Sequence, residues 1–376
     1  MLLTADRVVT PARVLAPGWL LSDGDRIVEV GDGTPPRTPD LELGDATVVP
    51  GFVDLHVHGG GGGSFDTGTA EVAEVVVSAH LAHGTTSMAG SIVSDSPDRM
   101  GRAVRELALL VREGRLAGIH LEGPWLSPER SGAHQPGALA APDPAAVDSL
   151  LAAGDGAVRM VTLAPELPGG IEAVRRISGA GVVAAIGHTD ASYDVARKAL
   201  EAGARLGTHL FNAMRPLHHR DPGPVGALLD APVDVELIAD GVHLHPAVLR
   251  TVFAAKPGRC ILVTDAMAAA GGPDGDYRLG PMAIEVRDGV ARLADGTGSG
   301  AIAGSTLTMD AALRFAVRTA GLPLLDVVHA ASTAPARAWG LDDVGALEAG
   351  RRADLVVLDA DLSVRRVMRA GAWVRR

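Results

Sequence analysis

The feature that most constrains this chain is a regular alternation of strand-like and helix-like segments between residues 51 and 340. The strand-like runs are VDLHVH, TTSMAGS, AGIHLEG, VRMVTLAPE, VVAAIGHT, LGTHLFNAM, VELIADGVH and CILVTDA. Helix-like stretches such as residues 71–84, 96–114, 192–203 and 245–258 lie between them, and each of these ends in Gly. Eight consecutive strand-then-helix units predict a (β/α)8 barrel of the TIM type, an α/β fold.

An open, doubly wound parallel sheet is the alternative fold that the same alternation allows. Sheets of that kind that bind dinucleotides carry a GxGxxG turn after the first strand, and no such motif opens a helix after the first strand-like run here. The 376 residues leave room for a barrel and one small domain. Hydrophobic residues make up 47% and aromatic residues only 3%, so we expect a large core built mainly from Ala, Val and Leu.

Both ends of the chain differ from the middle. Residues 1–50 and 344–376 alternate short β-like runs with turns, and Asp23-Gly24 is a hairpin signal. We therefore predict a small β-sandwich-like domain formed by the two terminal segments, next to a barrel domain at residues 51–343. Two separate terminal hairpins would produce a similar pattern and remain the alternative.

Charge and composition narrow the possible partners. The net charge of −11 argues against a general nucleic-acid surface, and no apolar run approaches the length of a membrane helix. Charge and proline arrive too early in the N-terminal residues for a signal-peptide core. The lone cysteine, Cys260, excludes an intramolecular disulfide framework. We expect a cytoplasmic protein with a small-molecule substrate.

Polar residues follow the strand-like runs at the points where a barrel gathers its functional groups. In a TIM-type barrel the carboxyl ends of all strands meet at one mouth. The residues at these positions are His56, His58, Glu122, His188, His209 and Asp265. Imidazoles and carboxylates are common ligands of zinc and similar ions, so the sequence predicts a metal site at the barrel mouth.

The chemistry of these residues suggests a division of roles. His188 and His209 with Glu122 form a set of two nitrogens and one carboxylate, which leaves a position open for water as in catalytic zinc sites. His56 and His58 project from the same side of a strand and could hold a second ion. Glu122, or a water molecule, could then bridge the two ions.

Asp265 is the candidate proton shuttle, since a carboxylate near an activated water can accept its proton and later protonate a leaving amine. The alternative is that Asp265 is only another ligand. The chain has just two lysines, Lys198 and Lys256, and neither follows a strand, which disfavours a bridging carboxylated lysine. We interpret the remaining histidines of helix-like or strand-like interiors as structural, namely His80, His83, His120 and His329.

Two loops carry further candidates. Residues 126–137 show no helical or strand period and hold two prolines and two glycines, so we predict a mobile loop at the barrel mouth that carries His134. Residues 212–226 follow a strand and are rich in Gly and Pro. This loop concentrates the basic side chains Arg215, His218, His219 and Arg220. It would suit a phosphate group, although a solvated loop with incidental charge is the alternative.

The motifs together resemble a known family. The series PGFVDLHVHG, LEGPWLSPERSGAH, IGHTDAS, THLFNAMRPL, IADGVHLH, LVTDAM and IAGSTLTMD is similar, in this order, to the N-acetylglucosamine-6-phosphate deacetylases of the amidohydrolase superfamily. The resemblance covers residues 48 to 340. It implies hydrolysis of N-acetyl-D-glucosamine 6-phosphate to D-glucosamine 6-phosphate and acetate, in amino-sugar catabolism or cell-wall recycling.

The resemblance also implies roles for individual residues. Glu122, His188 and His209 match the principal metal ligands, Asp265 matches the catalytic acid/base, and His134 matches the histidine that polarises the acetyl carbonyl. The candidate substrate contacts are Ala133, His134, Asn212, Ala213, Arg220, Asp240, His243, Ile302, Ala303 and Gly304. Some family members have amides in place of the two histidines of the first strand and hold one ion. This chain has both histidines, so a second ion is open to it, and His56, His58 and Asp265 are further candidate metal ligands.

The implied cofactor is one or two divalent ions per subunit, with zinc preferred over iron, cobalt or manganese. The implied assembly is a homodimer in which Arg220 reaches the partner's site. Two alternatives remain open. The chain could be another amidohydrolase, such as an N-acyl-amino-acid deacylase, a cyclic-amide hydrolase or a deacetylase of a different N-acetyl sugar phosphate. It could also be an inactive relative that acts as a binding module, although the intact ligand set disfavours this.

Overall fold

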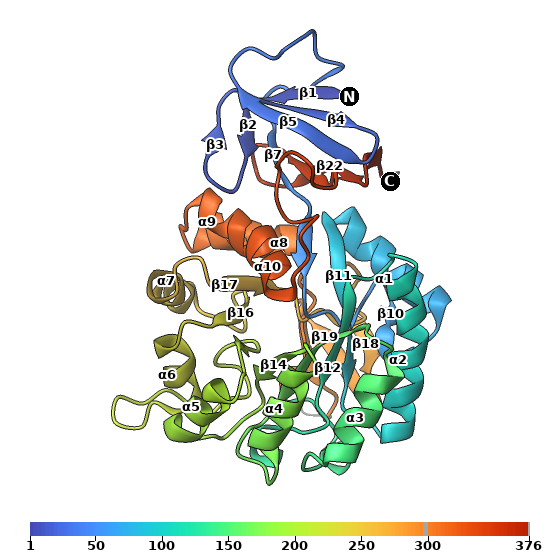
Figure 1. Cartoon of the computed structure of the whole chain (residues 1–376), viewed down its shortest axis with the longest axis vertical. Helices are drawn as coiled ribbons and strands as arrows, with labels where there is room; N and C mark the ends of the chain where they lie inside the picture. Colours follow the sequence, from blue (N-terminus) through green and yellow to red (C-terminus); the bar gives the residue numbers. More distant parts are fainter. Residues whose placement is uncertain (296–299, 375–376) are drawn as a thin grey trace.

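The centre of the molecule is a parallel sheet of eight strands that curls into a barrel (Figure 1). The computed structural model describes residues 1–295 and 300–374. The barrel strands are β8 (Phe52–Asp54), β11 (Thr85–Val93), β12 (Gly118–Glu122), β13 (Val158–Leu163), β14 (Val183–Ile186), β15 (Leu206–Gly207), β16 (Asp234–Ile238) and β17 (Cys260–Val263). They lie side by side in chain order, and each of them matches one of the predicted strand-like runs.

The first and last strands meet and close the barrel. Val57, just beyond β8, forms a parallel bridge with Ala266, just beyond β17. The carboxylate of Asp54 accepts hydrogen bonds from the backbone N–H of Thr264 at 3.2 Å and from its hydroxyl at 2.6 Å. Asp54 is fully buried, and burial raises its pKa to about 7. The predicted (β/α)8 barrel is therefore confirmed, and the open-sheet alternative is wrong.

Helices connect successive strands and surround the barrel (Figure 1). They are α1 (Ala70–Ala82), α2 (Pro97–Arg112), α3 (Pro144–Ala153), α4 (Gly170–Gly179), α5 (Tyr193–Glu201), α6 (Gly223–Asp230), α7 (Pro246–Ala255), α8 (Met309–Arg314), α9 (Leu324–Val328) and α10 (Ala334–Trp339). The four helix-like stretches named from the sequence correspond to α1, α2, α5 and α7. The hydroxyl of Ser192 starts α5 by accepting a hydrogen bond from the N–H of Val195 at 3.3 Å.

The two chain ends build a second part of the molecule, at the top of Figure 1. One sheet holds β5 (Arg26–Asp32), β4 (Gly18–Asp23), β1 (Leu2–Ala5) and β6 (Leu41–Glu42). The other holds β23 (Ala372–Trp373), β22 (Val364–Arg369), β21 (Leu355–Leu358), β7 (Thr47–Pro50), β2 (Arg7–Val9) and β3 (Val14–Leu15). Antiparallel pairing of β21 with β7 joins the two termini in one sheet, so separate terminal hairpins are excluded.

The two terminal sheets pack against each other through apolar side chains. Leu3, Leu20 and Ile27 from one sheet share a buried cluster with Val48 and Leu355 from the other. The turn after Asp23 joins β4 to β5 as the predicted hairpin. The sandwich-like fold class is confirmed, whereas the domain bounds at residues 50 and 343 stay predictions. Residues 375 and 376, at the end of the predicted second segment, lie outside the described residues.

Two small elements near the barrel mouth are additions to the predicted fold. The glycine run forms a hairpin of β9 (Gly59–Gly60) and β10 (Gly63–Ser64), because Gly61 and Gly62 take φ values of 60° and 91°, which favour glycine. A Cβ at Gly59 would lie 2.4 Å from the carbonyl oxygen of Gly63. The second element is a three-stranded sheet that follows β17 and precedes α8 in the sequence. Its strands are β18 (Gly275–Leu279), β19 (Met282–Arg287) and β20 (Val290–Leu293).

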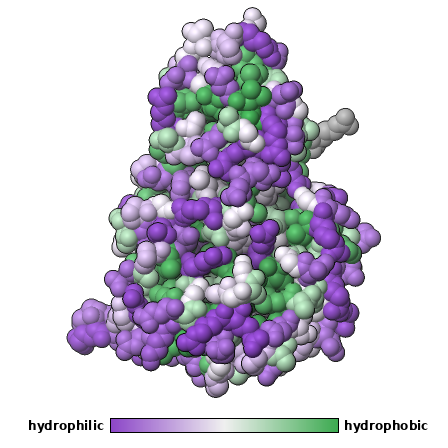
Figure 2. All heavy atoms as spheres, in the orientation of Figure 1, coloured by the Kyte–Doolittle hydropathy of each residue, from purple (hydrophilic) through white to green (hydrophobic). Residues whose placement is uncertain are grey.

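The surface seen in Figure 2 is mostly hydrophilic, and hydrophobic residues gather there in small groups. None of the described helices combines the length and the apolar character needed to cross a membrane.

Candidate active site

The side chains predicted to bind metal converge at the carboxyl ends of the barrel strands. His56 and His58 follow β8, Glu122 ends β12, and His188, His209 and Asp265 follow β14, β15 and β17. All six are buried. His188, His209 and Asp265 have φ values of 47°, 27° and 49°, a region that residues other than glycine rarely adopt and that is enriched at functional sites. His188 and His209 meet there, with their Nε2 atoms 3.2 Å apart, whereas Asp265 lies against His56 and His58.

Three of these side chains form a tight triangle of ligand atoms. Oε1 of Glu122 lies 3.1 Å from Nε2 of His188 and 3.0 Å from Nε2 of His209. The two imidazole nitrogens lie 3.2 Å apart. The structure thus brings together the set of two nitrogens and one carboxylate that the sequence predicts.

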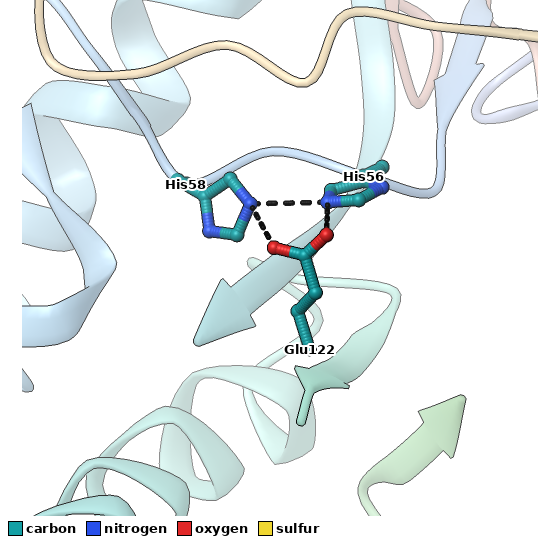
Figure 3. A group of neighbouring side chains, drawn as sticks. All are labelled: His56, His58 and Glu122. Atoms are coloured by element: carbon teal, nitrogen blue, oxygen red, sulfur yellow. Dashed lines mark hydrogen bonds and ion pairs between the residues drawn. The ribbon is translucent and has the colours of Figure 1, made fainter. Parts of the chain in front are cut away.

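A second group lies on the other side of Glu122 (Figure 3). Nε2 of His56 and Nε2 of His58 are 3.0 Å apart, and His58 Nε2 is 3.2 Å from Oε2 of Glu122. Oδ1 of Asp265 lies 3.4 Å from His56 Nε2 and 3.3 Å from His58 Nε2. Both carboxylate oxygens of Glu122 face this group, and Oε1, which also contacts His188 and His209, lies 3.5 Å from His56 Nε2.

These distances fit two metal positions that share a carboxylate. Bonds of about 2.0–2.1 Å place neighbouring ligands of a tetrahedral zinc ion about 3.3 Å apart, close to the separations in both groups. His56, His58 and Glu122 form one cluster of potential ligands, and Glu122, His134 and His188 form another. The donor set of imidazole nitrogen and carboxylate oxygen suits zinc and other borderline divalent ions.

The electrostatics of the cluster favour positive charge between the carboxylates. Burial lowers the pKa of His58, but Asp265 and Glu122 outweigh burial and raise that pKa to about 9. Burial raises the pKa of Asp265, but His56 and His58 outweigh it and lower that pKa to about 2. A divalent ion would supply the positive charge that the carboxylates attract.

The loop of residues 126–137 brings His134 into the site. Its Nδ1 accepts a hydrogen bond from the backbone N–H of Ser94 at 3.3 Å, and its Nε2 lies 3.2 Å from Oε2 of Glu122. Burial lowers the pKa of His134 to about 4. Because Nδ1 accepts, the neutral ring carries its proton on Nε2 and can donate it within the site.

The same loop is more regular than the sequence suggests. Short 3-10 turns span Pro128–Arg130 and Pro136–Ala138. Each turn begins with proline, whose fixed φ suits the first position of a helical turn. The expected lack of regular structure is therefore wrong for these segments, while mobility stays a prediction.

A cavity of about 340 Å³ opens beside the metal-ligand cluster. Its lining includes the predicted substrate contacts Ala133, His134, Asn212, Ala213, His243, Ile302 and Gly304. His58, Glu122, His188, His209 and Asp265 also line it. The cavity has room for a small ligand in direct contact with the predicted metal ligands.

Three predicted substrate contacts lie outside this lining. Asp240 instead accepts hydrogen bonds from the backbone N–H of His243 at 2.8 Å and from its Nδ1 at 2.6 Å, and so orients that histidine. Ala303 is fully buried and pairs with the backbone of Ala291. Arg220 lies on an exposed loop, where it contacts His219.

The comparison with known proteins places the chain in a family. The model of the amidohydrolase family matches residues 47–374. The chain belongs to the amidohydrolase family. It is 36% identical to the N-acetylgalactosamine-6-phosphate deacetylase of Escherichia coli O157:H7 over 93% of this chain and 94% of that protein. It is 35% identical to the N-acetylglucosamine-6-phosphate deacetylase of Lysinibacillus sphaericus, over 88% and 86% of the two chains.

Solved structures of amidohydrolases agree with this grouping. The N-acetyl-D-glucosamine-6-phosphate deacetylase of Mycobacterium smegmatis is 53% identical, covers 100% of both chains and superposes with a TM-score of 0.97. A variant of that enzyme was solved in complex with N-acetyl-D-glucosamine-6-phosphate. The corresponding enzyme of Thermotoga maritima is 31% identical, covers 100% of both chains and has a TM-score of 0.90. The resemblance drawn from the sequence motifs is confirmed.

Several residues at the site of this amidohydrolase were not predicted from the sequence, among them Arg130 and Glu236. Arg130 lines the cavity, and its carbonyl accepts a hydrogen bond from Nδ1 of His188 at 2.8 Å. Glu236 lies within β16, fully buried, with Oε2 3.2 Å from Nδ1 of His56. A signal for Glu236 exists in the run VELI, because a carboxylate inside a buried parallel strand is rare unless it is paired. No comparable sequence signal marks Arg130.

Proposed function

We propose that this amidohydrolase removes the acetyl group of N-acetyl-D-glucosamine 6-phosphate and releases D-glucosamine 6-phosphate and acetate. The observation that carries the proposal is the Glu122-centred cluster of imidazoles beside the cavity. The cluster occurs in a chain that superposes on the Mycobacterium smegmatis deacetylase with a TM-score of 0.97. The reaction breaks the amide C–N bond, adds the oxygen of water to the acyl carbon and protonates the nitrogen.

The residues that would hold the metal are Glu122, His188 and His209 at one position and His56, His58 and Asp265 at the other. A divalent ion bound there would supply Lewis acidity, which lowers the pKa of a water molecule and polarises the acetyl carbonyl. The side chains that would hold the ions are buried, and burial strengthens electrostatic interactions.

Asp265 is the proposed acid/base. Its carboxylate lines the cavity and lies at the metal-ligand cluster, within 3.4 Å of two imidazoles. It can accept a proton from the attacking water and deliver it to the departing nitrogen, as a positioned carboxylate does in general acid–base catalysis. An additional role as a ligand is compatible with the same position.

His134 is the proposed donor to the acetyl oxygen. The backbone N–H of Ser94 occupies its Nδ1, so Nε2 carries the proton of the neutral ring, 3.2 Å from Oε2 of Glu122 and at the cavity lining. A donor fixed in this way stabilises negative charge that develops on the oxygen during attack and pays no reorganisation cost.

The sugar phosphate would contact Asn212, Ala213 and His243, which line the cavity. Arg220 is exposed and lies outside the cavity of its own chain. This location supports the proposal that the chain forms a homodimer and that Arg220 serves the partner's site.

Zinc is the proposed ion, with iron, cobalt or manganese as alternatives, because imidazole-rich sites with carboxylates suit these metals. We place the enzyme in the cytoplasm, in amino-sugar catabolism or cell-wall recycling. The single cysteine, which is buried, supports a reducing compartment.

Acetate release from a panel of substrates tests the function, with metal content measured on the same sample. The panel holds the 6-phosphates of N-acetylglucosamine, N-acetylgalactosamine and N-acetylmannosamine and their unphosphorylated parents. We expect the highest kcat/KM for N-acetylglucosamine 6-phosphate. The 36% identity to the N-acetylgalactosamine-6-phosphate deacetylase of Escherichia coli O157:H7 makes N-acetylgalactosamine 6-phosphate the second candidate. A preferred unphosphorylated substrate would overturn the proposal.

A further inference from the structure

Glu236 is a buried carboxylate for which the proposed reaction has no role. It is the third residue of β16, it is 0% exposed, and it faces the interior of the barrel. It lies outside the lining of the cavity. A charged side chain at such a place is costly unless a partner compensates it.

The partners of Glu236 are one ring nitrogen and one backbone group. Oε2 lies 3.2 Å from Nδ1 of His56 and accepts a hydrogen bond from the backbone N–H of His209 at 3.3 Å. A carboxylate at Nδ1 keeps the proton of a neutral ring on that nitrogen. The lone pair of His56 Nε2 then points at His58, Glu122 and the second metal position.

The four imidazoles of the cluster differ in how their outer nitrogens are held. His188 donates its Nδ1–H to the carbonyl of Arg130 at 2.8 Å, and His56 faces Glu236. Among the described residues, Nδ1 of His58 and Nδ1 of His209 have no hydrogen-bond partner. Each proposed metal position therefore has one oriented imidazole, and only the His56 position has an anion behind it.

The charge on Glu236 is incompletely balanced by the described residues. Its Oε1 is buried and has no hydrogen-bond partner among them. The cluster already contains the carboxylates of Glu122 and Asp265, with Asp265 3.4 Å from His56. The three buried carboxylates near His56 and His58 are those of Glu122, Asp265 and Glu236. A second divalent ion would balance their negative charge better than two neutral imidazoles would.

We propose that Glu236 is the positioning residue that makes the His56/His58 group a binding site for a second divalent ion. It fixes the ring of His56 through Nδ1 and adds negative charge behind that ligand. This inference rests on the metal assignment of the proposed function. It goes beyond it by making occupancy of the second position depend on a residue of β16 that contacts no substrate.

The test is a metal-binding titration with Zn²⁺ on the full chain, followed by metal analysis of the dialysed protein. The variant Glu236→Gln keeps the size of the side chain and removes its charge. We expect two ions per chain in the unmodified protein. In the variant we expect one ion to bind about 10–100-fold more weakly, the usual cost of losing such a support, and the other to bind as before.

Two further variants identify the affected position. His56→Asn removes the ligand itself, so adding Glu236→Gln to it should cause no further loss if both act on one ion. Asp234→Asn is the matched control. It removes another buried carboxylate of β16, which pairs with Arg337 at 2.6 Å and contacts none of the imidazoles. We expect it to keep both ions.

Three results would overturn the inference. These are two ions bound with unchanged affinity in Glu236→Gln, equal loss of both ions, or a single ion in the unmodified protein. If Glu236→Gln does not fold, Glu236→Asp, which withdraws the carboxylate from His56 Nδ1, is held to the same expectation. Acetate release by the unmodified protein is measured separately, so failure of the deacetylase function and failure of the second-ion inference give different results.

Discussion

Asp265 combines two properties that rarely occur together outside functional sites. It is a buried carboxylate, and its backbone has a φ of 49°. Burial raises its pKa, but His56 and His58 outweigh burial and lower that pKa to about 2, so the carboxylate is ionised at neutral pH. The strand end places this base at the cavity, where the proposed reaction requires it.

Replacing Asp265 with Asn is expected to abolish most turnover. The amide keeps the shape but cannot take up a proton, and positioned acid/base groups contribute about 10²–10⁴-fold to rates. We expect kcat to fall by about that factor, with circular dichroism unchanged and the ion at Glu122, His188 and His209 retained. A variant with near-normal kcat would exclude Asp265 from proton transfer.

His134→Ala tests the proposed oxyanion contact. Loss of one such donor costs about 10²–10³-fold in kcat, and KM should change much less because the phosphate and ring contacts lie elsewhere. Steady-state kinetics with N-acetyl-D-glucosamine 6-phosphate separate the two parameters. A raised KM with normal kcat would instead make His134 a uniform binding contact.

At the scale of elements, α1 is tied to the glycine hairpin behind the site. His80 of α1 is buried and its Nε2 lies 2.9 Å from the carbonyl of Gly59. A Cβ at Gly60 would lie 2.7 Å from the same nitrogen. The hairpin that follows the ligand His58 can therefore pack on α1 only because Gly60 has no side chain. This contact gives His80 the structural role that the sequence predicts.

The burial of His80 predicts a pH-dependent stability. Burial lowers its pKa to about 4 in the folded protein, against about 6.5 when unfolded. The unfolded chain therefore takes up the proton first as the pH falls. The stabilising contribution is complete above pH 6.5 and is lost toward pH 4, by about 2 kcal/mol at pH 5.

Denaturant unfolding at pH 7 and pH 5 measures this effect. We expect the loss of stability between the two pH values to be about 2 kcal/mol smaller in His80→Gln than in the unmodified protein, since glutamine does not titrate. Other buried histidines titrate in both proteins and cancel in the comparison. Equal losses would show that His80 is not kept neutral by the fold.

At the scale of the whole molecule, Arg220 is exposed and lies outside the cavity of its own chain, and the proposed homodimer would bring it to the partner's site. Arg130 is the only arginine among the described residues that line the cavity. Its guanidinium group already pairs with Asp190 at 2.7 Å. A phosphate in this cavity would gain an unpaired cation from the partner subunit.

Arg220→Ala is expected to impair the phosphorylated substrate by about 1.5–3 kcal/mol, or roughly 10–150-fold in kcat/KM, and to spare an unphosphorylated one. Mixing Arg220→Ala protomers with Asp265→Asn protomers should restore part of the activity, because one of the two sites in a mixed dimer then has both residues. Absence of recovery after subunit exchange would place Arg220 outside the partner's site.

The sequence by itself determined the barrel and most of the proposed ligand set, because local patterns along the chain indicate both. Strand-like runs alternate with helix-like runs, and each ligand follows directly after its run, as His188 and His209 do. Parallel strands in a closed barrel must bring their carboxyl ends together. Local order along the chain was therefore enough to predict a shared site.

Only the tertiary structure decided how these residues act on one another. Glu236 and His56 are 180 positions apart in sequence, and they meet because closure of the barrel places β8 beside β17, the neighbour of β16. The same closure places Glu122 between two groups of imidazoles. Packing of the 126–137 loop against Ser94 decides which ring nitrogen of His134 carries the proton. Such contacts depend on three-dimensional distances, and no periodic pattern along the chain records them.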